Sequence, residues 1–244
     1  KDELGALAKK INQAASNAQE TLEQIEALGL AVSHELRSPL TRARLEVELL
    51  EGSKIKEDLL NEINAMETII TNILDTEALG SGNKKLQLEI FALNEMIDHM
   101  IETSGFLVNT NIAFNPLRDA TDIEADRTLF EVMIKNILEN AIRYNPADGK
   151  PIEISIGQME DAYEIQIRDF GPGFSEANIT KVTEPFYRTV QSRSRQSGGF
   201  GLGLYLCKQI VKAHLGTITI ENHEEKGAVI SLTIPKRQNQ IENA

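Results

Sequence analysis

The sequence separates a histidine that can accept a chemical group from a distant set of residues suited to a nucleotide. His34 lies in the run Ser-His-Glu-Leu-Arg-Ser-Pro-Leu at 33–40. The adjacent Glu35 can hydrogen-bond one ring nitrogen and leave the other free as a nucleophile. Far along the chain follow two spaced asparagines and two glycine-rich runs. The combination indicates phosphoryl transfer from ATP onto an imidazole, although His34 taken alone could be an ordinary exposed helix residue.

One polar helix face carries the two asparagines. A helix predicted over 126–144 brings Asn136, Asn140 and Arg143 to the same side, because their spacings of four and seven residues match 3.6 residues per turn. The opposite side is apolar and consists of Phe130, Ile134, Leu138 and Ala141. Asparagine is a poor helix former in helix interiors, so on this helix alone a solvated face and a functional face are equally open.

The two glycine-rich runs have different chemistry. In 169–173, Asp-Phe-Gly-Pro-Gly follows a predicted strand, where glycines admit a ligand to the backbone and the aspartate can accept a hydrogen bond from an adenine amine. Residues 198–204 open a predicted helix, whose free N–H groups and dipole favour phosphate. The polar stretch 189–197 has the composition of a mobile lid. Each run alone is weak evidence: no His-Arg-Asp loop precedes the first, and the second lacks the last glycine of a dinucleotide fingerprint.

Two kinds of hydrophobic periodicity position these residues. From residue 11 to 36 apolar or small residues alternate at spacings of three and four, the period of a coiled-coil seam, and the series slips by one residue next to Pro39, where we expect a bend. His34 falls off this seam and should face outward. A turn at 51–54 and a second amphipathic helix over 55–73 complete a helical hairpin. A second copy would cover its remaining apolar side and give a four-helix bundle with two-fold symmetry.

Beyond a predicted linker at Gly80-Ser81-Gly82-Asn83, strands and helices alternate. Alternating apolar and polar residues predict strands at 152–156, 163–167, 217–220 and 229–234. Helical periodicity covers 94–104, 126–144 and 202–214. This order predicts an α+β domain with helices packed over one face of a mixed sheet.

Composition excludes several classes of function. The 244 residues carry a net charge of −12 and 41% hydrophobic residues, which indicates a globular protein and argues against nucleic-acid binding. The single cysteine, Cys207, excludes disulfides and a cysteine-based metal cluster and fits a reducing, cytosolic environment. No stretch is apolar enough to span a bilayer. The chain starts without Met in a helical pattern, so we expect it to be part of a longer protein.

Together and in this order, the motifs closely resemble those of the sensor histidine kinases of two-component signalling. Residues 33–40 match the histidine box and 136–144 the asparagine box. Residues 169–173 match the first glycine box, 184–188 (Glu-Pro-Phe-Tyr-Arg) the phenylalanine box and 198–204 the second glycine box. The resemblance covers almost the whole chain.

The resemblance implies a multidomain chain from the cytoplasmic portion of an integral membrane sensor, with membrane contact only through a missing N-terminal part. Residues 1–14 would end a HAMP-like signalling helix, and 15–80 would be the dimerisation and histidine phosphotransfer domain, an all-α hairpin that forms a dimeric four-helix bundle. After a linker at 81–85, residues 86–238 would be a catalytic ATP-binding domain with the α+β sandwich of gyrase, MutL and histidine kinases. Residues 239–244 would be a tail.

The resemblance also implies roles for individual residues. His34 would be autophosphorylated from ATP and pass the group to an aspartate in the receiver domain of a response regulator, with Glu35 as base or orienter. Related kinases commonly carry threonine or asparagine at the position of Ser38 to dephosphorylate that regulator, and serine keeps the hydroxyl. Asn140 would hold Mg²⁺ and Asp169 would recognise adenine. The implied ATP-binding residues are Asn136, Asn140, Arg143, Tyr144, Asp169, Gly171, Gly173, Phe186, Arg188, Gly199, Gly201, Leu202, Gly203 and Leu204.

Two other functions remain open at this point. An ATP-hydrolysing clamp of the gyrase or MutL type would share the pocket, but those proteins place a glutamate base where this chain has Asn136. A signalling scaffold that binds nucleotide without transferring phosphate is the non-enzymatic alternative. For His99, His214 and His223 we expect only surface or packing roles.

Overall fold

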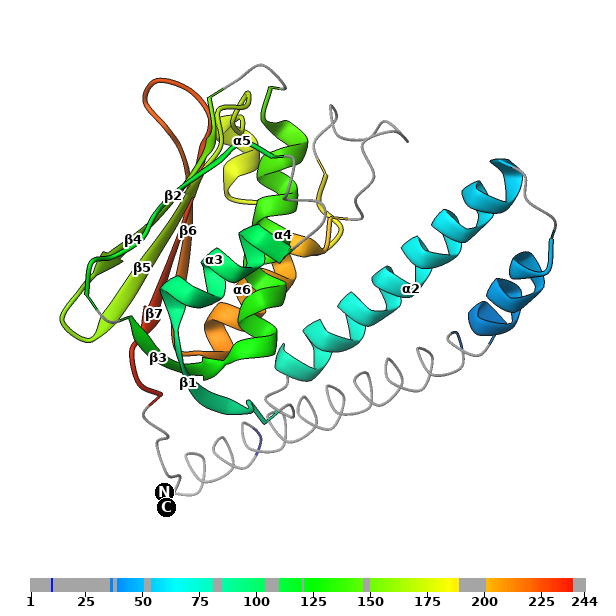
Figure 1. The fold of residues 1–244 in the computed structure, drawn as a ribbon, viewed down its shortest axis with the longest axis horizontal. Coiled ribbons are helices and arrows are strands. Elements are labelled where there is room, and N and C mark those ends of the chain that lie inside the picture. The colour runs from blue at the N-terminus through cyan, green and yellow to red at the C-terminus, as the bar shows by residue number, and fades with distance from the viewer. Residues whose placement is uncertain are drawn as a thin grey trace. The chain divides into compact units, whose positions relative to one another are not determined.

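The computed structural model divides the chain into two compact units, Lys1–Asn83 and Lys84–Ala244 (Figure 1). The structure describes residues 10, 36, 39–50, 54–80, 85–103, 110–119, 121–146, 150–188 and 201–238. None of the described helices is long and apolar enough to cross a membrane.

The first unit contains two packed helical segments, residues 39–48 and helix α2 (Lys54–Gly80). The predicted second helix is confirmed, but it continues to Gly80, so this glycine ends the helix and does not belong to a linker. Leu40, Ile63 and Ile70 are buried between the two segments. Arg44 joins them on the surface through an ion pair with Glu67 at 3.4 Å. The predicted coiled-coil seam before residue 36 lies outside the described residues.

Several large apolar side chains of this hairpin stay exposed in the single chain. Leu49 is 84% exposed and Ile55 68%. The others are Leu36, Leu45, Leu50, Leu59 and Met66. Apolar surface of this kind is expected where another chain covers it, so the predicted dimeric bundle has a physical basis but stays a prediction.

The second unit is built on a five-stranded mixed sheet with the strand order β2-β4-β5-β7-β6. Its strands are β2 (Ile112–Asn115), β4 (Ile152–Gln158), β5 (Ala162–Arg168), β6 (Thr217–Asn222) and β7 (Ala228–Pro235). Strands β2 and β4 are parallel, and the other neighbours are antiparallel. The four strands predicted from alternation are confirmed as β4 to β7, whereas β2 was not predicted.

A separate two-stranded sheet was also not predicted. It pairs β1 (Leu88–Ala92) with β3 (Asp122–Asp126) in antiparallel register. Strand β3 leads directly into helix α4, so this pair sets the position at which that helix begins.

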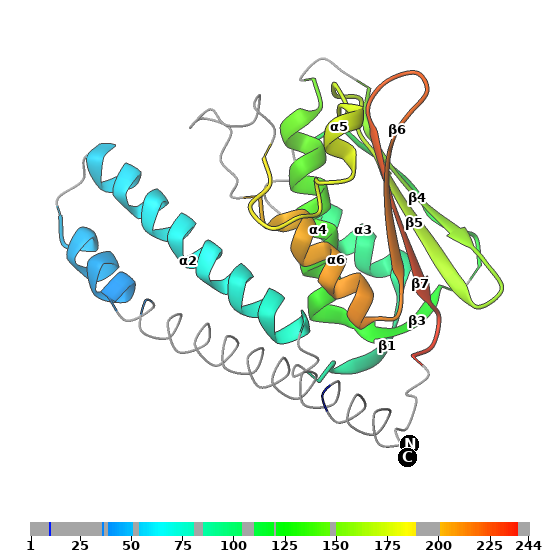
Figure 2. The same cartoon turned by 180° about the vertical axis from the view of Figure 1, so that it is seen from behind.

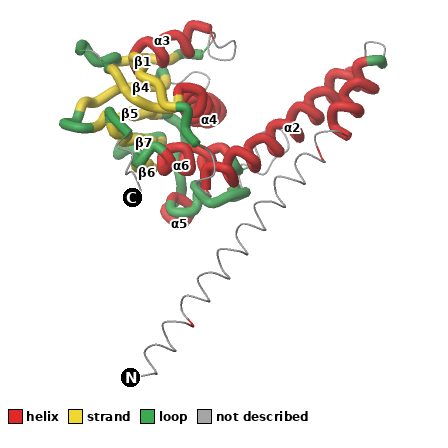
Figure 3. Tube along the Cα trace, turned by 90° about the horizontal axis from the view of Figure 1, so that it is seen from below, coloured by secondary structure: helices red, strands yellow, loops and turns green. Residues whose placement is uncertain are grey.

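Helices α3 (Leu93–Thr103), α4 (Arg127–Tyr144) and α6 (Gly203–Ala213) cover one face of the larger sheet, as the reverse view also shows (Figure 2). The view from below separates the helical layer from the strand layer (Figure 3). Alternate residues of β4, β5 and β7 are buried against the helices. The side of α4 that faces them, with Phe130, Ile134 and Leu138, is fully buried. The predicted α+β sandwich with helices on one face is therefore confirmed.

A buried polar contact joins the start of α4 to the end of α6. Asp126 caps α4 by accepting a hydrogen bond from Leu129 N at 3.1 Å, and its own N–H donates to His214 Nε2 at 3.0 Å. His214 Nδ1 lies 2.8 Å from Ile210 O, so these two contacts define a neutral imidazole with the proton on Nδ1. Burial lowers the pKa of His214. The predicted packing role of this histidine is confirmed.

Candidate functional site

Helix α4 presents a polar side that is only partly covered by protein. Asn136 and Asn140 are half-buried, and Arg143 and Tyr144 are exposed at the C-terminal end of the helix. The opposite side is in the core, as the spacing predicted. These polar side chains therefore share one side of α4 and are partly accessible to solvent.

The first glycine run lies against the end of this helix. A Cβ atom on Gly171 would be 2.5 Å from Tyr144 O, a separation that no side chain tolerates. Asp169 Oδ1 accepts hydrogen bonds from Gly171 N at 2.8 Å and from Ala228 N at 3.1 Å. Burial raises the pKa of Asp169, and the two N–H donors partly offset this by stabilising the carboxylate. The carboxylate is thus held in a fixed position beside the C-terminus of α4.

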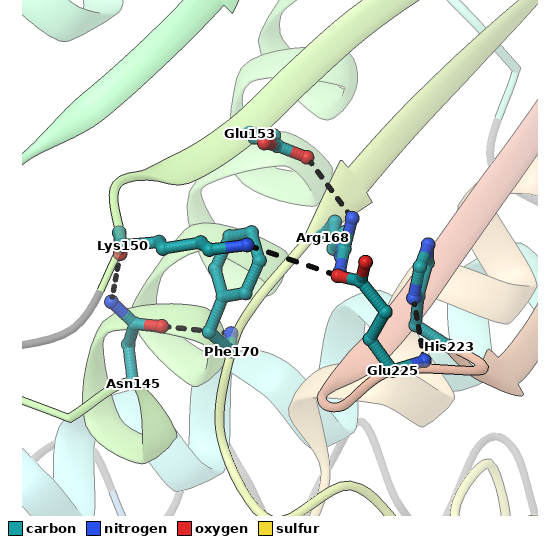
Figure 4. Close-up of polar contacts among 7 residues, drawn as sticks. All are labelled: Asn145, Lys150, Glu153, Arg168, Phe170, His223 and Glu225. Carbon is teal, nitrogen blue, oxygen red and sulfur yellow. Dashed lines mark hydrogen bonds and ion pairs between the residues drawn. The ribbon is translucent and has the colours of Figure 1, made fainter.

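Two cations lie close to the aromatic ring of Phe170 (Figure 4). The Arg168 guanidinium carbon lies 4.3 Å from the ring centroid and Lys150 Nζ lies 5.2 Å from it. Glu225 Oε2 is 3.2 Å from Arg168 Nη2 and 3.8 Å from Lys150 Nζ. The hydrogen bond from Arg168, followed by the nearby positive charges, lowers the pKa of Glu225. Arg168 also pairs with Glu153 at 3.5 Å, so the residue next to Asp169 is anchored on several sides.

The phenylalanine box and the second glycine run also meet. Phe186 has a left-handed backbone with φ 61° and is 62% exposed. Gly201 has φ +74°, and a Cβ there would lie 2.6 Å from Tyr187 O. A Cβ on Gly203 would lie 2.8 Å from Asn136 Oδ1. The start of α6 is therefore placed directly beside the polar side of α4.

The remaining predicted residues divide into two groups. Leu202 is buried and its carbonyl accepts the hydrogen bond from Leu206 N at 2.8 Å that starts α6, while Leu204 and Arg188 are half-buried. Four predicted residues lie outside the described part of the chain: His34, Glu35, Ser38 and Gly199. The structure thus brings together the polar face of α4 and both glycine runs.

Three residues of the site were missed by the sequence analysis. Gly227 has φ +96°, and a Cβ there would lie 1.8 Å from Asp169 O. Asn145 accepts a hydrogen bond from Phe170 N, and Asn222 accepts one from Phe174 N. A signal existed for Asn145, because an Asn-Pro pair after a helix is typical of a turn. Nothing local in the sequence marks the other two.

The arrangement fits a nucleotide. Asp169 supplies a fixed acceptor for a base amine. The four glycines at 171, 173, 201 and 203 allow the surrounding segments to approach closely, since an added Cβ at each would lie 2.5 to 2.8 Å from a neighbouring protein atom. The free N–H groups at the start of α6, together with Arg143, favour the negative charge of phosphates.

Comparisons with known proteins agree with this fold and site. Residues 125–238 match the family of histidine kinase-, DNA gyrase B- and HSP90-like ATPases, so the second unit is an ATP-binding domain of that class. Residues 30–82 match the His Kinase A (phospho-acceptor) domain. The chain belongs to the sensor histidine kinases of two-component signalling.

Individual relatives point the same way. The chain is 31% identical to the signal transduction histidine-protein kinase BaeS of Escherichia coli over 242 residues, which cover 96% of this chain and 52% of BaeS. It is 30% identical to the sensor histidine kinase WalK of Bacillus subtilis over 223 residues, which cover 86% of this chain and 36% of WalK. The chain therefore spans about half the length, or less, of these curated relatives.

Solved structures provide the same comparison for the fold. The catalytic domain of histidine kinase ThkA matches with a TM-score of 0.53 and 31% identity, covering 62% of this chain and 97% of that one. Acinetobacter baumannii histidine kinase AdeS matches with a TM-score of 0.63 and 21% identity, covering 84% of this chain and 98% of that one. At that identity the AdeS match supports the fold alone.

Proposed function

We propose that this chain is an ATP-dependent autokinase that phosphorylates His34 and passes the phosphoryl group to an aspartate in the receiver domain of a response regulator. The observation that carries this proposal is the match of residues 30–82, which contain His34, to a phosphoacceptor domain. The assembled ATP-binding domain in the same chain supplies the phosphoryl donor.

The described residues have distinct roles in this proposal. Asp169 accepts a hydrogen bond from the exocyclic amine of adenine, while Asn136, Arg143 and the start of α6 bind the phosphates. Within the described residues no group of three or more His, Cys, Asp or Glu side chains can hold a metal ion. The amide oxygen of Asn140 is an oxygen ligand of the kind that Mg²⁺ takes, and the other ligands would come from the nucleotide and water. When bound, Mg²⁺ neutralises charge on the phosphates.

On the acceptor side, the transfer involves the His34 imidazole and the neighbouring Glu35. An unprotonated ring nitrogen of His34 forms a bond to the terminal phosphorus of ATP as the bond from that phosphorus to the bridging oxygen breaks, and ADP leaves. Glu35 holds the proton on the other ring nitrogen and stabilises the positive charge that develops on the ring. The same chain would also dephosphorylate the response regulator. In that reaction the Ser38 hydroxyl positions the water that attacks the phosphorylated aspartate.

The chain acts as a homodimer in this proposal. The exposed apolar side chains of the hairpin, such as Leu49 and Ile55, support a second copy as the partner that covers them. Residues 1–14 are the end of a HAMP-like helix through which a membrane sensor would act, and Pro39 marks a bend that lets the His34 segment move.

Radiolabelled ATP with Mg²⁺ tests the autokinase. We expect label that survives alkali, is lost in acid, and is absent from His34→Gln. His99→Gln is the matched control, because His99 is an exposed histidine on α3, and it should label like the wild type. Undiminished label in His34→Gln would overturn the proposal. Rapid ATP hydrolysis without label would instead identify an ATP-hydrolysing clamp of the gyrase or MutL type. Nucleotide binding with neither hydrolysis nor label would identify a signalling scaffold.

A further inference from the structure

The first glycine run is held at both of its ends by asparagine side chains from distant elements. We infer that Asn145 and Asn222 are positioning residues that fix the distance between the base-reading Asp169 and the phosphate-binding side of α4. This pair is called the asparagine clamp below. The inference rests on the proposed role of Asp169 in reading adenine.

Asn145 forms the end of the clamp at α4. As the C-cap residue of that helix it donates its backbone N–H to Ala141 O at 2.9 Å. Its side-chain Oδ1 accepts a hydrogen bond from Phe170 N at 2.8 Å, and its Nδ2 donates to Lys150 O at 3.0 Å. One side chain therefore joins the end of α4 to the residue that follows Asp169 and to the segment that enters β4 (Figure 4).

Asn222 forms the other end. It is the last residue of β6, and its amide brackets one residue, accepting from Phe174 N at 2.7 Å and donating to Phe174 O at 2.6 Å. The chain can reach this position only through Gly173, which has φ +70° and whose Cβ would lie 2.6 Å from Asn222 Oδ1. The second end of the run is thus joined to the sheet.

The clamp matters because one rigid ligand must contact both sides of the pocket. Asp169 is fixed to β7 through two hydrogen bonds with Ala228: Asp169 N donates to Ala228 O at 3.0 Å, and Ala228 N donates to Asp169 Oδ1 at 3.1 Å. No comparable side-chain bond ties Asp169 itself to α4 among the described contacts, so Asn145 carries that connection through the next residue. Without the asparagine clamp, the distance between Asp169, the proposed adenine acceptor, and Asn140 would no longer be fixed. The pocket would then lose its preorganisation for ATP.

Asn94 provides a matched control in the same unit. Its side chain brackets Leu117, donating to O at 2.8 Å and accepting from N at 3.3 Å. The number and type of hydrogen bonds equal those of Asn222, but they join the start of α3 to residue 117 and include neither glycine run. A purely structural effect of losing such a bracket should therefore be the same in Asn94→Ala.

The test compares Asn145→Ala, Asn222→Ala and Asn94→Ala in the whole 244-residue chain, by calorimetric titration with ATP and with GTP. We expect the clamp variants to bind ATP about tenfold more weakly, the effect of losing one or two hydrogen bonds. Binding of GTP should change little, because guanine presents a carbonyl where adenine presents its amine. The preference for ATP over GTP should therefore fall by about the same factor. Asn94→Ala should keep that preference while its melting temperature falls comparably.

Kinetics give a second readout in the labelling assay. The clamp variants should raise the KM for ATP while kcat at saturating ATP stays near the wild-type value, because full occupancy restores the bound geometry. An unchanged preference for ATP over GTP in both clamp variants, or an equal loss in Asn94→Ala, would overturn the inference. So would a wild type that binds ATP and GTP equally. The titration requires no phosphoryl transfer. A wild type that prefers ATP but never labels His34 would therefore contradict the proposed autokinase activity without contradicting the proposed role of Asn145 and Asn222.

Discussion

Among the glycines that the structure describes in the nucleotide-binding unit, Gly227 should be the least replaceable, although it lies in no motif. It has φ +96°, and a Cβ at this position would be 1.8 Å from Asp169 O and 3.0 Å from Phe170 Cα. Both contacts are with backbone, so no side-chain rotation can relieve them. Gly227→Ala must move either the turn between β6 and β7 or the segment that carries the Asp169 carboxylate, which we propose to read adenine.

The magnitude follows from two terms. A non-glycine residue in this region of backbone space costs about 1–3 kcal/mol, and overpacking adds about 1–3 kcal/mol. We expect Gly227→Ala to lower the free energy of unfolding by about 2–6 kcal/mol. If the Asp169 segment moves, ATP affinity should fall by more than about tenfold, since each factor of ten requires 1.4 kcal/mol.

Denaturant unfolding and ATP titration measure both effects, and Gly157→Ala is the matched control. Gly157 lies in β4, where the nearest atoms to an added Cβ belong to Glu164 at 3.8 Å, an ordinary contact. That variant should keep its stability or gain about 0.4–1 kcal/mol, with unchanged ATP binding. A Gly227→Ala protein as stable as Gly157→Ala, with wild-type ATP affinity, would refute the assignment of this turn as a support of the pocket.

Three further predictions concern α6 and its ends. Burial holds the pKa of His214 below its usual value of 6.5. The stabilising contribution of the neutral His214 is therefore present above pH 6.5 and is lost as the pH falls below it, by up to about 1.4 kcal/mol per pH unit. The free energy of unfolding should differ less between pH 7 and pH 5 in His214→Gln than in the wild type. An equal difference in the two proteins would contradict this. Burial also raises the pKa of the Cys207 thiol, so a thiol reagent should label it only in denaturant, and rapid labelling of the native chain would count against the packing described. Leu215 has φ 56° and is 60% exposed, so Leu215→Gly should raise the free energy of unfolding by about 1 kcal/mol, and a lower value would show that its side chain packs.

The parts of the fold that could be predicted from sequence are those with a local period. Strands β5 and β7 alternate buried and partly exposed residues along their whole length, β4 does so over its first five residues, and α4 buries one continuous side. Strand β1 does not alternate, with two adjacent exposed residues at Glu89 and Ile90. Strand β2 has only four residues and is defined by its parallel pairing with β4. Neither of these short segments alternates by itself, and the partner strand of each lies far away in the chain, so both were missed.

The residues of the site also fall into those that a local pattern predicts and those that only distant contacts define. Glycines at 171, 173, 201 and 203 recur in short runs because a ligand and a close backbone approach both exclude side chains, and this makes them visible in the sequence. Asn222 acts through two hydrogen bonds to the backbone of Phe174, and Gly227 acts through close contact with the backbone of Asp169. Both partners lie more than forty residues away in the chain. The neighbours of Asn222 and Gly227 in sequence are ordinary turn residues.

The Phe170 contacts show why this distinction matters for function. Arg168 at the end of β5 and Lys150 in the segment before β4 both contact the ring, and Glu225 pairs with both cations. Asn145 holds the backbone of Phe170 from the end of α4. Phe170 is 7% exposed, so it contributes to the pocket by fixing its neighbour Asp169 rather than by offering surface to a ligand. A motif of ligand-contacting residues can therefore be intact in a related chain whose supporting contacts are lost, and such a chain should bind ATP weakly despite carrying every box.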